Sequence, residues 1–121
     1  MTSNFFITLF SFITAISVLV FIHEFGHFIV GRYFGIKVLK FSIGFGKKLW
    51  SKTHGDDQTE YCISLIPLGG YVKFLDGREG EVEKEDVGRA FNHRPIYARI
   101  AVLLAGPLFN FIFAILAYWF L

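Results

Sequence analysis

The residues best suited to chemistry form the pentapeptide HEFGH at positions 23–27, near the end of an apolar run that begins at Phe5. On a helix, side chains four positions apart lie on the same face, so both imidazoles can reach one metal ion. Glu24 can lie beside that ion without binding it and take a proton from an attacking water. The spacing therefore predicts zinc ligands at His23 and His27 and a catalytic base at Glu24.

The surroundings of this motif strengthen the prediction. From Phe5 to Val30 the only full charge is Glu24. Ionisable groups inside an apolar membrane segment each cost about 2.5–3.5 kcal/mol on insertion scales, so three together indicate a functional site. The alternative is a buried polar cluster whose only role is to hold helices together.

Composition predicts a membrane chain. Of 121 residues, 54% are hydrophobic and sixteen are Phe, which is more apolar than an ordinary soluble domain of this size. Residues 5–34 and 100–121 are each long enough for one transmembrane helix. We expect a membrane α-helical fold with a small β-rich insertion, divided into segments 1–35, 36–99 and 100–121. The apolar end at Leu121, which has no flanking charge, is interpreted as a truncation.

The basic residues predict an orientation. All twelve Lys and Arg lie between Arg32 and Arg99. By the positive-inside rule, residues 36–99 are cytoplasmic and the N-terminus is periplasmic. The net charge of +2 is small and spread through a mixed loop, which gives no indication of nucleic-acid binding.

The middle of the chain has strand-like patterns. Residues 38–43, 60–66 and 71–74 are rich in β-branched and aromatic residues, and the sequence PLGG at 67–70 is a turn signal. We therefore expect a hairpin of residues 60–66 and 71–74 around that turn. Cys62, the only cysteine, is expected to be a small apolar residue in a strand. The sheet is expected either to cap the helices or to offer an open working edge.

Small and polar residues in the second apolar segment suggest helix contacts. Gly106 and Asn110 are four positions apart, a spacing that lets helix backbones approach. Asn110 also offers an interhelical hydrogen bond, and Pro107 is expected to kink the helix. Helix packing alone would explain all three residues.

Four motifs in order resemble the N-terminal portion of a bacterial site-2 protease, of the regulator of sigma-E protease type. They are HEFGH at 23–27, FSIGFG at 41–46, IPLGGYVK at 66–73, and AGP at 105–107 with Asn110. The resemblance implies a zinc-dependent intramembrane endopeptidase of the bacterial inner membrane, with Zn²⁺ as its cofactor. Its implied partners are membrane lipid and transmembrane protein substrates, such as an anti-sigma factor after a first cut or a signal-peptide remnant. The resemblance also implies that the hairpin around residues 61–74 corresponds to a membrane-associated β-loop that engages extended substrate.

The chain departs from the family pattern in two respects. The family's third zinc ligand is an Asp in a Leu-Asp-Gly motif on a later helix, and the family carries PDZ domains; neither is recognisable here. Leu75-Asp76-Gly77 has the same letters but lies in a charged loop, so we expect the third ligand beyond Leu121 and expect residues 1–121 alone to be inactive. Two alternatives remain, a bitopic zinc peptidase with an aqueous catalytic domain and a non-catalytic membrane scaffold.

Overall fold

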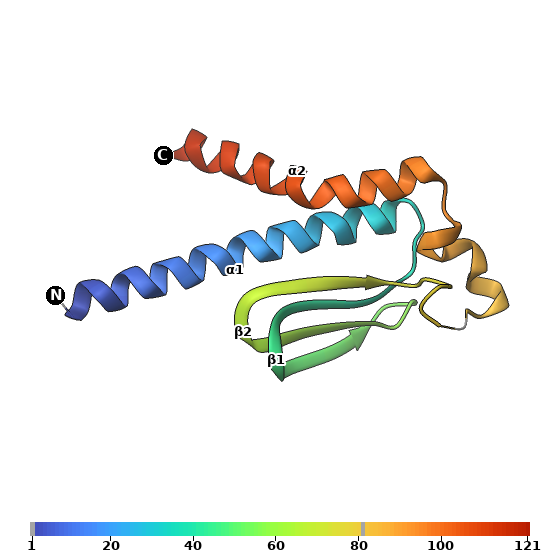
Figure 1. Cartoon of the computed structure of the whole chain (residues 1–121), viewed down its shortest axis with the longest axis horizontal. Helices are drawn as coiled ribbons and strands as arrows, with labels where there is room; N and C mark the ends of the chain where they lie inside the picture. The colour runs from blue at the N-terminus through green and yellow to red at the C-terminus, as the bar shows by residue number, and fades with distance from the viewer. Residues whose placement is uncertain (1, 81) are drawn as a thin grey trace.

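The computed structural model describes residues 2–80 and 82–121. Met1, the first residue of the predicted segment 1–35, and Glu81 lie outside the described residues. The elements follow in the order α1 (Thr2–Tyr33), β1 (Val38–His54), β2 (Thr59–Phe74), the 3-10 helices η1 (Lys84–Arg89) and η2 (Phe91–His93), and α2 (Ile96–Phe120). In Figure 1 the C-terminal half of α1 lies between α2 on one side and the β-strands on the other.

Both long helices agree with the two predicted apolar segments. Ser3–Tyr33 and Ile96–Phe120 are long and apolar enough to cross a membrane, with mean hydropathy of 2.6 and 2.4. Helix α2 begins at Ile96, four residues before the predicted start at 100, because Pro95 stands at the N-cap and proline suits a helix start. The helix continues through Pro107 and bends near its middle (Figure 1).

Helix α1 ends at a C-terminal capping motif that depends on Gly35. Gly35 has a φ of +78°, a left-handed conformation that glycine adopts without a Cβ clash. The Ile36 amide donates to the Gly31 carbonyl at 3.0 Å, and the Gly35 amide donates to the Arg32 carbonyl at 3.0 Å. These two bonds form a Schellman motif, which satisfies the last carbonyls of the helix and turns the chain toward β1.

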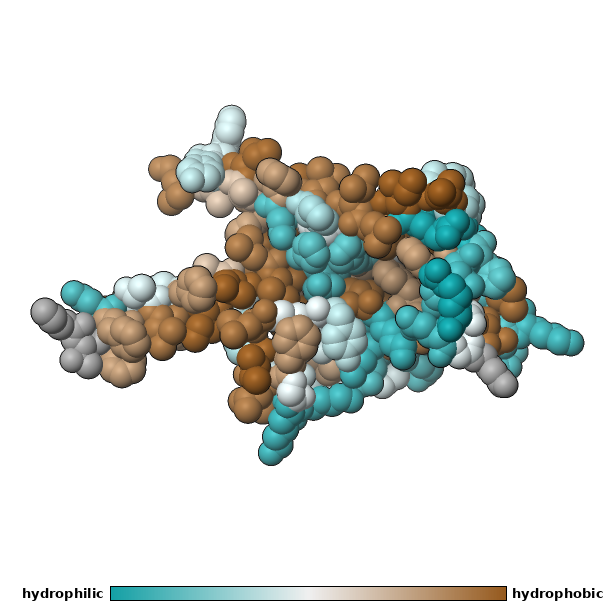
Figure 2. Space-filling model, in the orientation of Figure 1, coloured by the Kyte–Doolittle hydropathy of each residue, from teal (hydrophilic) through white to brown (hydrophobic). Residues whose placement is uncertain are grey.

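The outer halves of the helices carry exposed apolar side chains. Phe6 and Phe10 on α1 are 60% and 73% exposed, and Leu116 and Trp119 on α2 are 51% and 82% exposed. Figure 2 shows hydrophobic surface over both helices and hydrophilic surface gathered at the end where the loops lie. Contiguous apolar surface on this scale is typical of a face covered by lipid or by further helices.

The strands form a more complex sheet than the predicted hairpin. β1 and β2 pair antiparallel through a turn at residues 55–58, and each is long and bent, so that β1 pairs with two separate parts of β2. Lys40 is paired with both Lys73 and Glu60, so residues 38–43 lie between residues 70–74 and 60–63. Residues 60–63 pair on their other side with the outer half of β1, residues 50–53.

The prediction of a hairpin turn at residues 67–70 was therefore wrong. This stretch lies within β2 and carries the chain from the inside of the sheet to its edge. The Pro-Leu-Gly-Gly sequence marks a bend within β2 rather than a reversal between neighbouring strands, and sequence patterns do not distinguish the two. In consequence, residues 70–74 form an edge segment and residues 60–63 do not.

A small core joins α1 to the sheet beneath the pentapeptide. Phe28, Val38 and Phe41 are buried together, and Val72 and Phe74 pack against them. These contacts fix the height and rotation of α1 above the edge segment. The same helix carries the predicted site residues, so the core positions the site.

A candidate metal centre between α1 and α2

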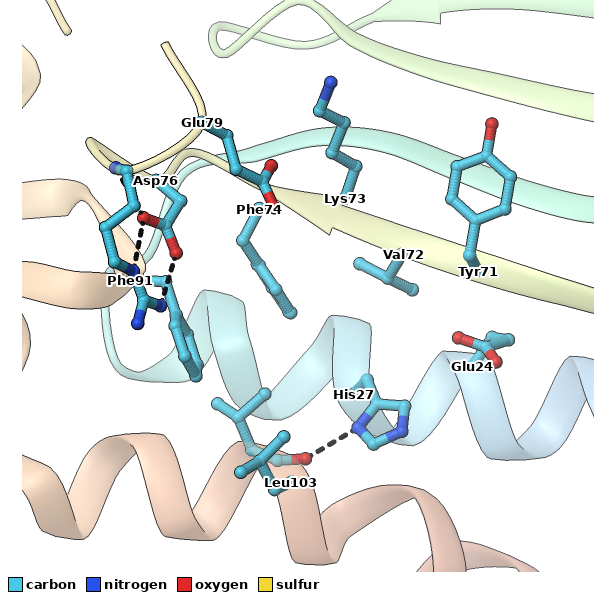
Figure 3. A pocket seen from close by; sticks show the side chains of 12 residues that line it. Glu24, His27, Tyr71, Val72, Lys73, Phe74, Asp76, Glu79, Phe91 and Leu103 are labelled. Carbon is cyan, nitrogen blue, oxygen red and sulfur yellow. Dashed lines mark hydrogen bonds and ion pairs between the residues drawn. The ribbon is translucent and has the colours of Figure 1, made fainter.

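The two predicted ligands converge at the junction of the helices. The Nε2 atoms of His23 and His27 lie 3.2 Å apart, and both side chains are half-buried. Helical spacing of four residues brings the rings together, as the sequence predicted. Glu24 is on the same stretch of α1 and points toward β2 (Figure 3).

Helix α2 supplies a polar partner to each imidazole. His27 Nδ1 lies 2.7 Å from the carbonyl oxygen of Val102, and since that oxygen can only accept, His27 Nδ1 must donate. Asn110 Nδ2 lies 3.3 Å from His23 Nδ1. Such partners on the distal ring nitrogens are what orients metal-binding histidines in proteins.

A glycine on α2 keeps the space in front of the rings open. At Gly106 an added Cβ would overlap His27 Nε2 and would lie 2.9 Å from His23 Cε1. Gly106 is buried, and a helix residue with no side chain lets the rings approach the α2 backbone. The two rings therefore lie against Gly106 in a space that the methyl group of an alanine at this position would fill.

The arrangement fits zinc. A tetrahedral ion with two nitrogens at about 2.0–2.1 Å holds those nitrogens about 3.3 Å apart. The observed separation of the His23 and His27 Nε2 atoms is 3.2 Å. With both Nδ1 atoms bonded elsewhere and both Nε2 atoms converging, the donor set is that of a partial zinc site.

Within residues 2–80 and 82–121, no group of three His, Cys, Asp or Glu side chains is placed to hold a metal ion. Asp76 does border the same groove as His27, but both of its carboxylate oxygens are engaged by Arg78. Hydrogen bonds from the Arg78 side chain hold the pKa of Asp76 below its usual value. The Asp76 carboxylate is thus bound by Arg78 in this structure, and the position of the third ligand stays a prediction.

Two grooves meet at Glu24. One, of about 560 Å³, runs between Glu24 and His27 on the helix side and residues 71–74 of β2, and continues to Asp76 (Figure 3). The other, of about 400 Å³, is bordered by Glu24, His23 and residues 68–70 of β2. Consecutive residues 68–74 therefore border open space on both sides of the Glu24 carboxylate.

The sequence predicted a specific role for some residues of this site and no role for others. His23, Glu24 and His27 were predicted from their spacing and from the apolar segment around them. The structure brings the two imidazoles together, and the roles of all three residues stay a prediction. Asn110 was recognised only as a general interhelical donor. The contact of His27 with the Val102 carbonyl was missed, because a backbone acceptor has no sequence signal.

Comparisons with known proteins place the chain in a family. A model described as peptidase family M50 matches residues 11–121. A Vibrio cholerae protein named as a zinc metalloprotease is 57% identical over 109 residues, which cover 90% of this chain and 24% of that protein. The regulator of sigma-E protease RseP of Escherichia coli K12 is 56% identical, and the regulator of sigma E protease of Haemophilus influenzae 55%, with the same coverage. The chain thus spans about a quarter of the length of these relatives. The extent of the family match and these identities show that the chain belongs to peptidase family M50, the family of site-2 proteases.

Proposed function

We propose that this chain is part of a zinc-dependent endopeptidase that cleaves transmembrane segments within the membrane. The observation that carries the proposal is the pair of converging imidazoles at the meeting point of two grooves, with Glu24 between the grooves. The family membership and the zinc metalloprotease name of the Vibrio cholerae relative support it.

The residues have distinct tasks in this reaction. His23 and His27 would hold the ion, and the Val102 carbonyl keeps the ring of His27 in the tautomer that leaves Nε2 free. When bound, zinc supplies Lewis-acid chemistry that polarises a peptide carbonyl and acidifies water. Glu24 takes the proton of the attacking water and passes it to the amide nitrogen as the carbon–nitrogen bond breaks. With two ligands in this stretch, we propose that the third is provided by a part of the protein outside residues 1–121.

Substrate must be held in an extended form. A helix pairs all its backbone groups internally, so its peptide bonds are shielded until it unwinds. Residues 70–74 form an edge of the sheet, with residues 38–43 on one side and the groove of Glu24 and His27 on the other. A substrate segment added along residues 68–74 would pair with free backbone groups and pass Glu24; at about 3.3 Å per residue this path extends about 20 Å.

The setting proposed for this site is the bacterial inner membrane. Helices α1 and α2 would cross it, and the basic residues between Arg32 and Arg99 would face the cytoplasm. The outer, apolar halves of the helices would then contact lipid or further helices of the same protein. By family resemblance, substrates would be anti-sigma factors after a first cut or signal-peptide remnants.

The test compares zinc content with cleavage in the full-length protein. Glu24→Gln keeps the shape of the side chain but cannot take a proton, so it should retain zinc and lose cleavage of a transmembrane substrate in detergent or liposomes. His27→Ala should lose both zinc and cleavage. Normal cleavage by the Glu24→Gln variant would overturn the proposed mechanism, and a His27→Ala variant with full zinc content would remove the metal site.

A further inference from the structure

The last part of β2 runs beside α1 in the same direction and contacts it near both ends (Figure 1). At one end the Ser17 hydroxyl lies 2.8 Å from the Ile13 carbonyl oxygen of its own helix and 3.2 Å from the Pro67 carbonyl oxygen of β2. At the other end the ring of Phe74 packs over Gly31, where an added Cβ would overlap it. Residues 67–74 are therefore held against α1 at two places.

Glu24 lies midway between these two contacts. Ser17, Glu24 and Gly31 are seven positions apart, so they lie close to one line along the surface of α1. From Ser17 to Gly31 the helix extends about 21 Å, and from Pro67 to Phe74 the strand extends about 23 Å. Helix and strand thus cover the same length, and Glu24 borders both of the grooves that lie between them.

The contact at Gly31 is tight on every side of the Phe74 ring. Phe74 points from β2 toward α1 (Figure 3) and stacks on Phe91, with ring centroids 5.9 Å apart. It also packs against the buried cluster that includes Phe28 and Val38. Because Gly31 has no side chain, the ring lies directly against the helix backbone. An atom added at Gly31 should therefore displace the ring together with the strand that carries it.

We propose that Gly31 and Phe74 are positioning residues that set the width of the groove between α1 and the edge segment, and so the distance of a bound substrate backbone from Glu24. The inference rests on the proposed function, because it takes a substrate that pairs with residues 70–74. In the described part of the chain these residues pair only with residues 38–43. A substrate joined to this edge moves with it, whereas Glu24 stays on α1.

The experiment substitutes Gly31→Ala in the full-length protein. The new methyl group would lie 2.7 Å from Phe74 Cζ, whereas ordinary contacts are 3.4–4 Å, so the ring must move by about 1 Å. A misplacement of that size lowers a catalytic rate by about 100-fold. We expect kcat per bound zinc, measured on a transmembrane substrate in detergent, to fall about 10- to 100-fold. KM should stay near the wild-type value, because the edge that binds the substrate is intact.

Compensating and control substitutions separate positioning from a general loss of structure. Phe74→Leu shortens the side chain and makes room for the methyl group, so combining it with Gly31→Ala should recover most of the lost kcat, whereas two independent defects would add. Phe74→Trp enlarges the ring from the strand side and should lower kcat as Gly31→Ala does. Gly88→Ala is the matched control, because a Cβ at Gly88 meets nothing within 4 Å, and it should cleave as wild type does.

Zinc content separates this inference from the proposed function, since all these variants should keep their zinc. Wild-type kcat in both Gly31→Ala and Phe74→Trp would overturn the inference. A double variant no better than Gly31→Ala would also overturn it, as would a loss that appears in KM alone. If Gly31→Ala does not fold, Phe74→Trp decides by the same measurements. Wild-type protein that cleaves without zinc, or not at all, would remove the proposed function and this inference with it.

Discussion

Gly106→Ala should weaken zinc binding, because its methyl group would fill the space that the His23 and His27 rings occupy. The new Cβ would overlap His27 Nε2 and lie 2.9 Å from His23 Cε1. In a helix interior without such neighbours, Gly→Ala stabilises the folded protein by roughly 0.5–1 kcal/mol. Helix propensity alone would therefore raise the melting temperature, whereas the added Cβ should weaken zinc binding. Overpacking a fitted site costs about 1–3 kcal/mol. If the rings absorb that strain, the zinc dissociation constant should rise about 5- to 150-fold.

The assay is zinc affinity of the full-length protein by chelator competition, alongside thermal unfolding of the metal-free form. Gly88→Ala is the control, because a Cβ at Gly88 meets nothing within 4 Å. It should bind zinc as wild type does. Wild-type zinc affinity in Gly106→Ala, together with a higher melting temperature, would show that α2 does not face the two histidines as described.

Three further predictions concern the sheet, the loop and the orientation. Proline substituted in turn at residues 71–74 should reduce cleavage more than stability at the positions whose amide points into the groove. Tyr61→Pro lies in a segment that is paired on both sides and should unfold the sheet. Equal effects on folding and cleavage at every position would show that the edge only covers the helices and does not bind substrate. Hydrogen bonds from Arg89 hold the pKa of Asp57 below its usual value, so the pair stabilises above a pH of about 3.9 and loses this effect as pH falls through the lowered pKa. Asp57→Asn should therefore lower stability by up to about 1 kcal/mol near neutral pH and by little in strong acid, where Asp57 is itself neutral, and a full-sized difference that persists in acid would contradict the ion-pair explanation. Ser51→Cys should react with impermeant thiol reagents only from the cytoplasmic side, and labelling from outside intact cells would reverse the proposed topology.

The parts of the structure that follow local chemical rules were predictable from sequence. The apolar runs gave both long helices, and the four-residue spacing brought His23 and His27 onto one face. The stop of α1 follows from Gly35, whose conformation no other residue adopts as easily. Each of these features depends on neighbours within a few positions.

What could not be predicted depends on distant pairing. The insertion of residues 38–43 between two parts of β2 leaves no local signal, so the bend at 67–70 was interpreted as a hairpin turn. The acceptor for His27 is a backbone carbonyl 75 positions away, which any residue type could supply. Gly106 was recognised as a small residue that lets helices approach, but only the structure shows that the histidine rings fill the space.

The proposed function requires that His23 and His27 together bind one zinc ion. X-ray absorption at the zinc edge of the purified full-length protein tests it directly, because imidazole ligands give a distinctive outer-shell scattering. We expect two imidazoles with nitrogens at about 2.0–2.1 Å, and one fewer around any zinc that His23→Gln still binds. A zinc spectrum without imidazole scattering, or one unchanged by His23→Gln, would contradict the claim.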